Sequence, residues 1–115
     1  MSRRDDAVPM RHMLDHAREA IAIIRNRSRA DLDSDRVLQL AVRQVIQIVG
    51  EAASRVSNEG RARHPHIPWR DAVAARNRMI HGYDSVDYDI VWQILTEEFP
   101  PLVAALERAL SGHTS

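Results

Sequence analysis

Hydrophobic residues recur every three to four positions along most of the chain, which is the spacing of one face of an α-helix. Pro9 suits the first position of a helix, because its missing N–H would have no partner there. The pattern after it predicts a helix that fades near residues 26–28, with an apolar face made of Met10, Leu14, Ala17, Ile21 and Ile24. The side-chain oxygens of Asp31, Asp33 and Ser34 can then cap the next helix.

A second helix is predicted over about residues 35–56, the most apolar stretch of the chain. It carries two adjacent stripes, Leu38, Ala41, Val45, Ile48 and Ala52 beside Val42, Ile46, Val49, Ala53 and Val56. Together the stripes cover an arc wider than the roughly 100° that a surface helix buries. Such a helix is central in a bundle or shared with a partner, and in so short a chain the second face suggests a homodimer.

Residues 57–67 contain Asn, Gly and Pro and predict a loop. Pro68 then opens a third helix. This helix should end near His81, because Gly82 is a natural C-terminal cap.

A fourth helix can be capped by Ser85 or Asp87. Pro100 and Pro101 must kink or restart it, because proline removes a backbone donor and crowds the preceding turn. The apolar pattern continues beyond them to residue 110.

These elements predict an all-α fold, an antiparallel bundle of four to five helices in a dimer. The 115 residues have room for one domain, 1–115, with an ordered core over about 9–110. Hydrophobic residues make up 44% of the chain, enough for a core, while 4 Gly and 5 Pro are too few for a many-stranded sandwich.

Cysteine is absent from the sequence, which excludes disulfides, thiolate zinc sites and cysteine nucleophiles. The first ten residues have no apolar stretch typical of a signal peptide, and no run approaches the roughly 18 to 20 apolar residues of a membrane span. A cytoplasmic protein that does not contact membranes is therefore expected.

The formal charge is zero but unevenly distributed, and all 16 basic residues are arginine. Residues 55–81 hold six Arg against two acids, together with His64, His66 and His81, whereas residues 82–115 hold one Arg against six acids. The basic segment suggests a local anion site on a neutral protein, not a general nucleic-acid coat.

Several His and Asp residues have the spacing of metal ligands but are better explained by structural roles. His12 and His16 have a spacing that can hold a metal, but we interpret them as surface or partly buried helix residues. His64 and His66 can bind a metal or be solvated in a loop, and we favour the solvated loop. The aspartates at positions 31, 33 and 35 lack the Gly and distal Glu of a calcium loop, so capping is the better interpretation.

Residues 76–83 (RNRMIHGY) gather two guanidiniums, an amide, an imidazole and a phenol at a predicted helix end. Basic groups there can simply complement the helix dipole. Alternatively, Arg76 can bind a phosphate through two hydrogen bonds and His81 can transfer a proton, which suffices for RNA cleavage by the 2′-hydroxyl without a metal. The two residues lie about 140° apart around an ideal helix, so they converge only if the helix ends at His81.

This segment resembles the Arg-x4-His-x-Tyr motif of HEPN domains, and the rest of residues 10–110 resembles the HepT subgroup. The matching blocks are residues 48–53 (IVGEAA), 65–70 (PHIPWR), 87–92 (DYDIVW) and 99–102 (FPPL). The resemblance implies a helical dimer with both motifs at a shared cleft, and a metal-independent endoribonuclease that needs no cofactor. It implies a toxin of a toxin–antitoxin pair, with an MntA-like nucleotidyltransferase as antitoxin that adds AMP to Tyr83.

The leading hypothesis is therefore RNA cleavage to a 2′,3′-cyclic phosphate end. Arg76 would hold the phosphate, His81 would transfer a proton or act as a cation, and Asn77 would orient either group. Arg78 would support or only flank the site, and Glu51, expected to be buried, would pair with Arg76 or Arg78 or form a structural ion pair. The alternative is a catalytically silent dimer that binds a nucleotide or a nucleotidyltransferase.

Overall fold

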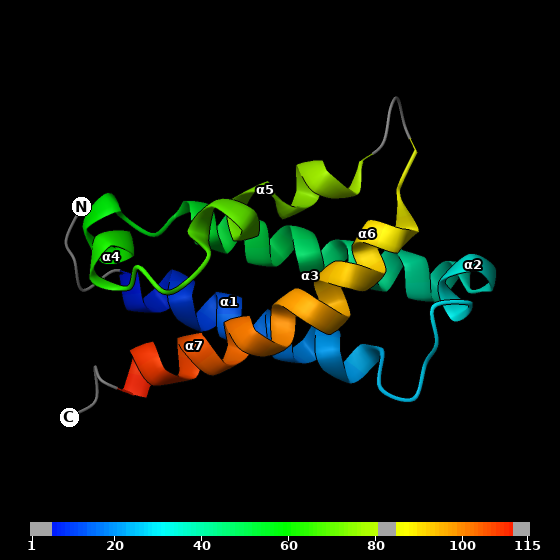
Figure 1. Cartoon of the computed structure of the whole chain (residues 1–115), viewed down its shortest axis with the longest axis horizontal. Helices are drawn as coiled ribbons and strands as arrows, with labels where there is room; N and C mark the ends of the chain where they lie inside the picture. The colour runs from blue at the N-terminus through cyan, green and yellow to red at the C-terminus, as the bar shows by residue number, and fades with distance from the viewer. Residues whose placement is uncertain (1–5, 81–84, 112–115) are drawn as a thin grey trace.

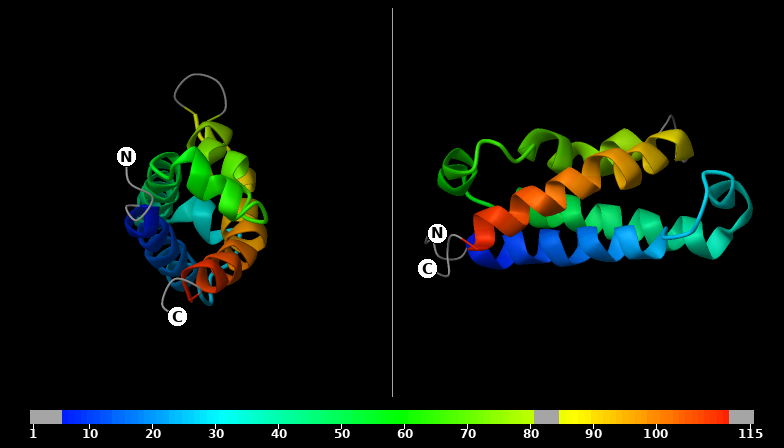
Figure 2. Two further views of the ribbon diagram at one scale, coloured as in Figure 1. Left: turned by 90° about the vertical axis from the view of Figure 1, so that its left-hand side faces the viewer. Right: turned by 60° about the horizontal axis from the view of Figure 1, so that its bottom comes forward.

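α3 (Arg36–Ser54) lies at the centre of the packing, between α1 (Ala7–Ile23) and α5 (Trp69–Met79). The structure, a computed structural model, describes residues 6–80 and 85–111. After α5, a rod of α6 (Tyr88–Gln93), the π-helix η2 (Ile94–Glu98) and α7 (Phe99–Ser111) runs back and packs on α1. Successive long helices run in opposite directions, so that the start of α1 and the end of α7 lie at the same end of the molecule (Figures 1 and 2). The all-helical prediction is confirmed for the residues that the structure describes.

The two apolar stripes of α3 are mostly buried within a single chain. Val42, Ile46, Val49, Ala53 and Val56 are all buried, and so are Leu38, Val45 and Ala52 of the other stripe. The wide arc arises because α1 and α5 cover α3 from two sides. It therefore fits the central position that the sequence allowed, and a partner is not needed to explain it. The exposed large hydrophobic side chains of α3 are Val37 and Leu40, which belong to neither stripe.

Two short helices depart from the sequence prediction. α2 (Asp31–Ser34) forms where only capping residues were expected, and its Leu32 is completely buried. α4 (Asn58–Arg63) occupies the stretch predicted as a loop, so that prediction was wrong. Ser57 caps α4 by accepting a hydrogen bond from the backbone N–H of Gly60 at 3.0 Å. Helices of four and six residues are too short to show an apolar period.

The proline pair in the last rod causes neither a break nor a loop. η2 immediately precedes Phe99, and α7 starts there without interruption. Because Pro100 and Pro101 cannot donate backbone hydrogen bonds, the turn before them widens into a π-helix. The predicted restart does not occur, because the helical rod continues through the prolines with a π-helix directly before them.

A buried carboxylate fastens the start of α1 to α4. Asp6 is only 3% exposed and accepts hydrogen bonds from the Ser57 backbone N–H at 2.9 Å and from the Ser57 hydroxyl at 2.6 Å. The guanidinium of Arg63 lies 3.7 Å from the carboxylate. Gly60 leaves room for it, because a Cβ there would lie 2.3 Å from an Asp6 oxygen. Burial alone would raise the pKa of Asp6, but the hydrogen bonds from Ser57 and the charge of Arg63 outweigh it and lower the pKa.

We expect Asp6→Ala to lower the free energy of unfolding by about 2 kcal/mol near neutral pH, because the Ser57 donors lose their acceptor. A carboxylate whose pKa is lower in the folded state stabilises the fold at pH values above its unfolded pKa of about 3.9. This stabilisation is lost as the pH falls through the pKa of the folded state. Urea unfolding of both proteins across this range should show the difference shrinking at acid pH. Asp15→Ala, at an exposed position on α1, is the control, and a pH-independent difference would contradict the expectation.

No helix within the described parts of the chain is both long enough and apolar enough to cross a membrane.

Candidate functional site

The position of α5 depends on a close helix contact at Gly50. A Cβ at this position would lie 3.1 Å from the carbonyl oxygen of Ala72 and 3.6 Å from that of Val73. The missing side chain therefore allows the backbones of α3 and α5 to approach each other. Arg76 follows Ala72 by four residues, so the contact also places the side of α5 that carries Arg76 against α3.

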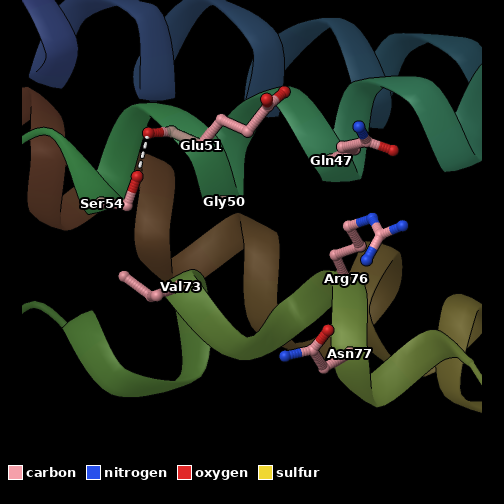
Figure 3. Close-up of a pocket in the computed structure, with 7 residues that line it drawn as sticks. All are labelled: Gln47, Gly50, Glu51, Ser54, Val73, Arg76 and Asn77. Carbon is pink, nitrogen blue, oxygen red and sulfur yellow. Dashed lines mark hydrogen bonds between the residues drawn. The ribbon is translucent and has the colours of Figure 1, made fainter.

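A pocket of about 150 Å³ opens between α3 and α5 next to this contact (Figure 3). Its lining comes from the second half of α3 and from the middle of α5: Gln47, Gly50, Glu51, Ser54, Val73, Arg76 and Asn77. In Figure 3 the side chain of Arg76 points from α5 toward α3, on the side of Gln47. Two residues of the predicted motif, Arg76 and Asn77, thus share one cavity with Glu51.

Arg76 and Arg78 differ in their surroundings. Arg76 is exposed and forms no hydrogen bond or ion pair with any other residue that the structure describes. Arg78 donates two hydrogen bonds of 2.6 Å to the two carboxylate oxygens of Glu98 in η2. The hydrogen bonds to Glu98 raise the pKa of Arg78 above its usual value, against the effect of burial. Of these two cations, Arg76 is the one available to an anionic ligand.

Glu51 corrects one of the sequence expectations. It is exposed instead of buried, and neither Arg76 nor Arg78 pairs with it in the described structure. Its carboxylate points away from α5 in Figure 3. Glu51 lines the pocket from an exposed position on α3.

The end of α5 also differs from the prediction. The helix ends at Met79, two residues before His81, and Ile80 is extended with φ −84° and ψ 123°. Ile80 forms an antiparallel bridge with Val86, and the backbone N–H of Asp87 donates to the carbonyl oxygen of Met79 at 2.8 Å. Pairing with the segment before α6 therefore competes with a further helical turn. His81, Gly82 and Tyr83 lie outside the described residues.

Asp87 caps α6, which confirms one of the two alternatives. Its carboxylate accepts hydrogen bonds from the backbone N–H groups of Asp89 and Ile90, at 3.0 and 3.2 Å. α6, which corresponds to the predicted fourth helix, therefore begins directly after the bridge between Ile80 and Val86.

The histidines of α1 lie on its outer side. His12 is exposed, and His16 is hydrogen-bonded to Glu19 at 3.0 Å, as expected for surface residues. His66 is exposed and its ring stands 6.1 Å from that of half-buried His64. Within residues 6–80 and 85–111, the structure contains no group of three or more potential metal ligands.

The aspartates before α3 serve as caps and ion-pair partners. Asp35 caps α3 by accepting from the Leu38 backbone N–H at 3.0 Å, and Asp31 accepts from the Ser28 N–H at 2.7 Å. Asp33 instead pairs with Arg29 at 3.0 Å. The capping interpretation is thus confirmed for Asp35 but not for Asp31, which lies inside α2 and binds the segment before it.

Residues 13–109 match a protein family described as "Ribonuclease HepT-like". The chain belongs to the HepT-like ribonuclease family. A relative from Thermococcus cleftensis named "Probable ribonuclease HepT" is 33% identical over 83% of this chain and 90% of its own length. A Methanocaldococcus jannaschii protein named "Putative RNase MJ1380" is 29% identical over 93% of this chain and 98% of its own length. No solved structure matches the chain.

The site of this HepT-like protein contains further residues that the sequence did not predict. Gln47, Ser54 and Val73 line the pocket, and Glu98 binds Arg78. Gln47 and Ser54 lie four residues before and three residues after Glu51, so helical spacing could have placed them on the same face of the helix. Glu98 is 20 residues from Arg78, and periodicity gives no signal for that pairing.

Proposed function

We propose that this HepT-like protein is a metal-independent endoribonuclease that acts through Arg76 and His81. The observation that carries the proposal is the arrangement of Arg76, an exposed guanidinium without a described partner, at a pocket of a ribonuclease-family fold. A guanidinium with free donors can bind two phosphate oxygens at once and stabilise the charge that grows on them during cleavage.

RNA itself supplies the nucleophile in the proposed reaction. The ribose 2′-oxygen loses its proton and attacks the phosphorus, the bond from phosphorus to the 5′-oxygen breaks, and the leaving 5′-oxygen takes up a proton. The products are a 2′,3′-cyclic phosphate and a 5′-hydroxyl. His81 moves a proton or, when protonated, stabilises charge. Asn77 orients the phosphate or the imidazole, and Tyr83 contacts the RNA.

Purified protein should therefore cleave RNA in the presence of EDTA, and the cleaved ends should be cyclic phosphates. The products can be separated on denaturing gels, and acid treatment or a phosphatase that opens cyclic ends identifies the terminus. If EDTA-treated wild-type protein binds RNA or nucleotide without cleaving it, the silent binding module becomes the better assignment.

We also propose that the ribonuclease is the toxin of a toxin–antitoxin pair. Its antitoxin is an MntA-like nucleotidyltransferase that transfers AMP to Tyr83. Support comes from the family membership and from Arg76, which offers an anion site five residues before the motif imidazole and seven before the motif phenol. RNA is the substrate and the nucleotidyltransferase is the protein partner.

The protein should be a homodimer in which the two motifs share a cleft. Val37 and Leu40 support this, because they stand three residues apart on α3 with 77% and 49% of their surfaces exposed. Sedimentation at micromolar concentration should give the mass of a dimer or a larger assembly, and Leu40→Glu should shift it toward monomer. A stable wild-type monomer would contradict the prediction.

A further inference from the structure

The last turn of α5 is held to the opposite rod by a two-pronged ion pair. Arg78 and Glu98 form two parallel hydrogen bonds of 2.6 Å, and each side chain is 28% exposed. Paired planar groups in this geometry define both distance and orientation, and partial burial reduces screening by salt. Glu98 itself is well supported, because buried Phe99 follows it directly and buried Leu95 lies three residues before it.

A second connection follows one residue later. The Asp87 N–H donates to the Met79 carbonyl at 2.8 Å, and Ile80 pairs with Val86. Residues 78, 79 and 80 are thus each bound to η2 or to the segment that leads into α6. These contacts join the segment before residues 81–84 to the segment after them and to η2. Residues 81–84 include His81 and Tyr83 of the motif.

We infer that Glu98 is a positioning residue for the ribonuclease site: it clamps Arg78 and so holds the last turn of α5, the helix that carries Arg76. The catalytic part of this inference rests on the proposed function. Arg76 lies two residues before the clamped arginine and His81 three residues after it. Active sites lose rate steeply when catalytic groups shift by about 1 Å, so a clamp at this point acts on turnover.

The clamp also assigns a role to Arg78 that differs from phosphate binding. Both carboxylate oxygens of Glu98 already bind its guanidinium, and the raised pKa of Arg78 reflects these hydrogen bonds. The pair is locally neutral, which leaves Arg76 as the cation at the pocket. The structure therefore distinguishes Arg76, which is exposed at the pocket, from Arg78, which is paired with Glu98.

The first test compares Glu98→Gln with Glu97→Gln, which changes an exposed neighbour in the same π-helix. Glu98→Gln should lower kcat for RNA cleavage by about 10- to 100-fold with a much smaller change in KM, because the substrate-binding arginine remains. Glu97→Gln should match the wild type. The exchanged pair, Arg78→Glu with Glu98→Arg, should recover a large part of the lost kcat. Equal effects of the two glutamine variants, or no recovery in the exchanged pair, would overturn the inference.

The second readout does not depend on activity. In Glu98→Gln, the Asp87 amide proton should exchange with solvent faster, because its acceptor, the Met79 carbonyl, adjoins the released Arg78. The amide proton of Val49, a buried residue of α3, should keep its wild-type exchange rate. If the Asp87 amide exchanges faster in Glu98→Gln but the wild-type protein cleaves no RNA, the clamp stands and the proposed function is rejected. Unchanged exchange at Asp87, or faster exchange at Val49 to the same degree, would overturn the clamp.

Discussion

Arg76→Ala and His81→Ala should each abolish RNA cleavage, and with it toxicity in cells, without unfolding the protein. Loss of a group that stabilises charge in the transition state typically costs about 2.7 to 4 kcal/mol, or a 10²- to 10³-fold decrease in rate. Arg76 is exposed and has no partner among the described residues, so its truncation leaves no buried group unsatisfied. The measurements are the rate of RNA cleavage in EDTA and the thermal unfolding midpoint.

Arg70→Ala is the matched control for Arg76→Ala. Both arginines are exposed on α5, but Arg70 does not line the pocket. We expect Arg70→Ala to retain the wild-type rate within a few fold. If Arg76→Ala and His81→Ala fold normally and cleave as fast as the wild type, the catalytic assignment fails and a binding role is favoured.

Addition of AMP to Tyr83 should silence the ribonuclease by occupying its anion site. Tyr83 lies two residues from His81 in the sequence, so a group attached to it is held near the proposed cleavage site. The AMP phosphate would bind Arg76 in place of the RNA backbone, and the purine would obstruct RNA entry. Arg78 contributes less than Arg76, because Glu98 already binds its guanidinium. Modified protein should therefore lose cleavage while its circular dichroism spectrum stays unchanged.

Mass spectrometry after co-expression with the cognate nucleotidyltransferase tests this expectation. The AMP-sized mass should map to Tyr83 and disappear in Tyr83→Phe. Tyr88→Phe is the control, because Tyr88 is half-buried at the start of α6 beside Asp87 and Asp89. Full neutralisation of a Tyr83→Phe protein that is still toxic alone would mean that complex formation, not modification, is the antitoxin mechanism.

The apolar period was sufficient to predict the long helices but not the short ones. α3 was predicted over about residues 35–56 and forms over Arg36–Ser54, because its many buried aliphatic residues repeat the pattern several times. α4 was predicted as a loop, since six residues with Gly60 among them contain no repeat. Its formation depends on the Ser57 cap and on Asp6, which is 51 residues away from Ser57.

The residue types of the site were visible in the sequence, whereas their partners were not. Residues 76–83 identified Arg76, and the spacing placed it near a helix end, but the helix ends at Met79 because Ile80 pairs with Val86. Glu51 was expected to be buried and to pair with Arg76 or Arg78 or form a structural ion pair, but it is exposed, and Glu98 is the carboxylate that pairs with Arg78. A pair separated by 20 residues depends on where two helices cross, which local spacing does not encode.

The sequence by itself therefore determined the all-helical class, the central apolar helix, the cap at Asp35, the choice between Ser85 and Asp87 as the cap of the last predicted helix, and the resemblance that the family match confirmed. These features are local, since helical period and capping act within a few residues. Only the tertiary structure decided which arginine is free, where α5 ends and which faces of α3 are covered within one chain. Those outcomes depend on the approach of α5 to α3 at Gly50 and on the contact of η2 with Arg78, and both contacts bring together residues that are distant in sequence.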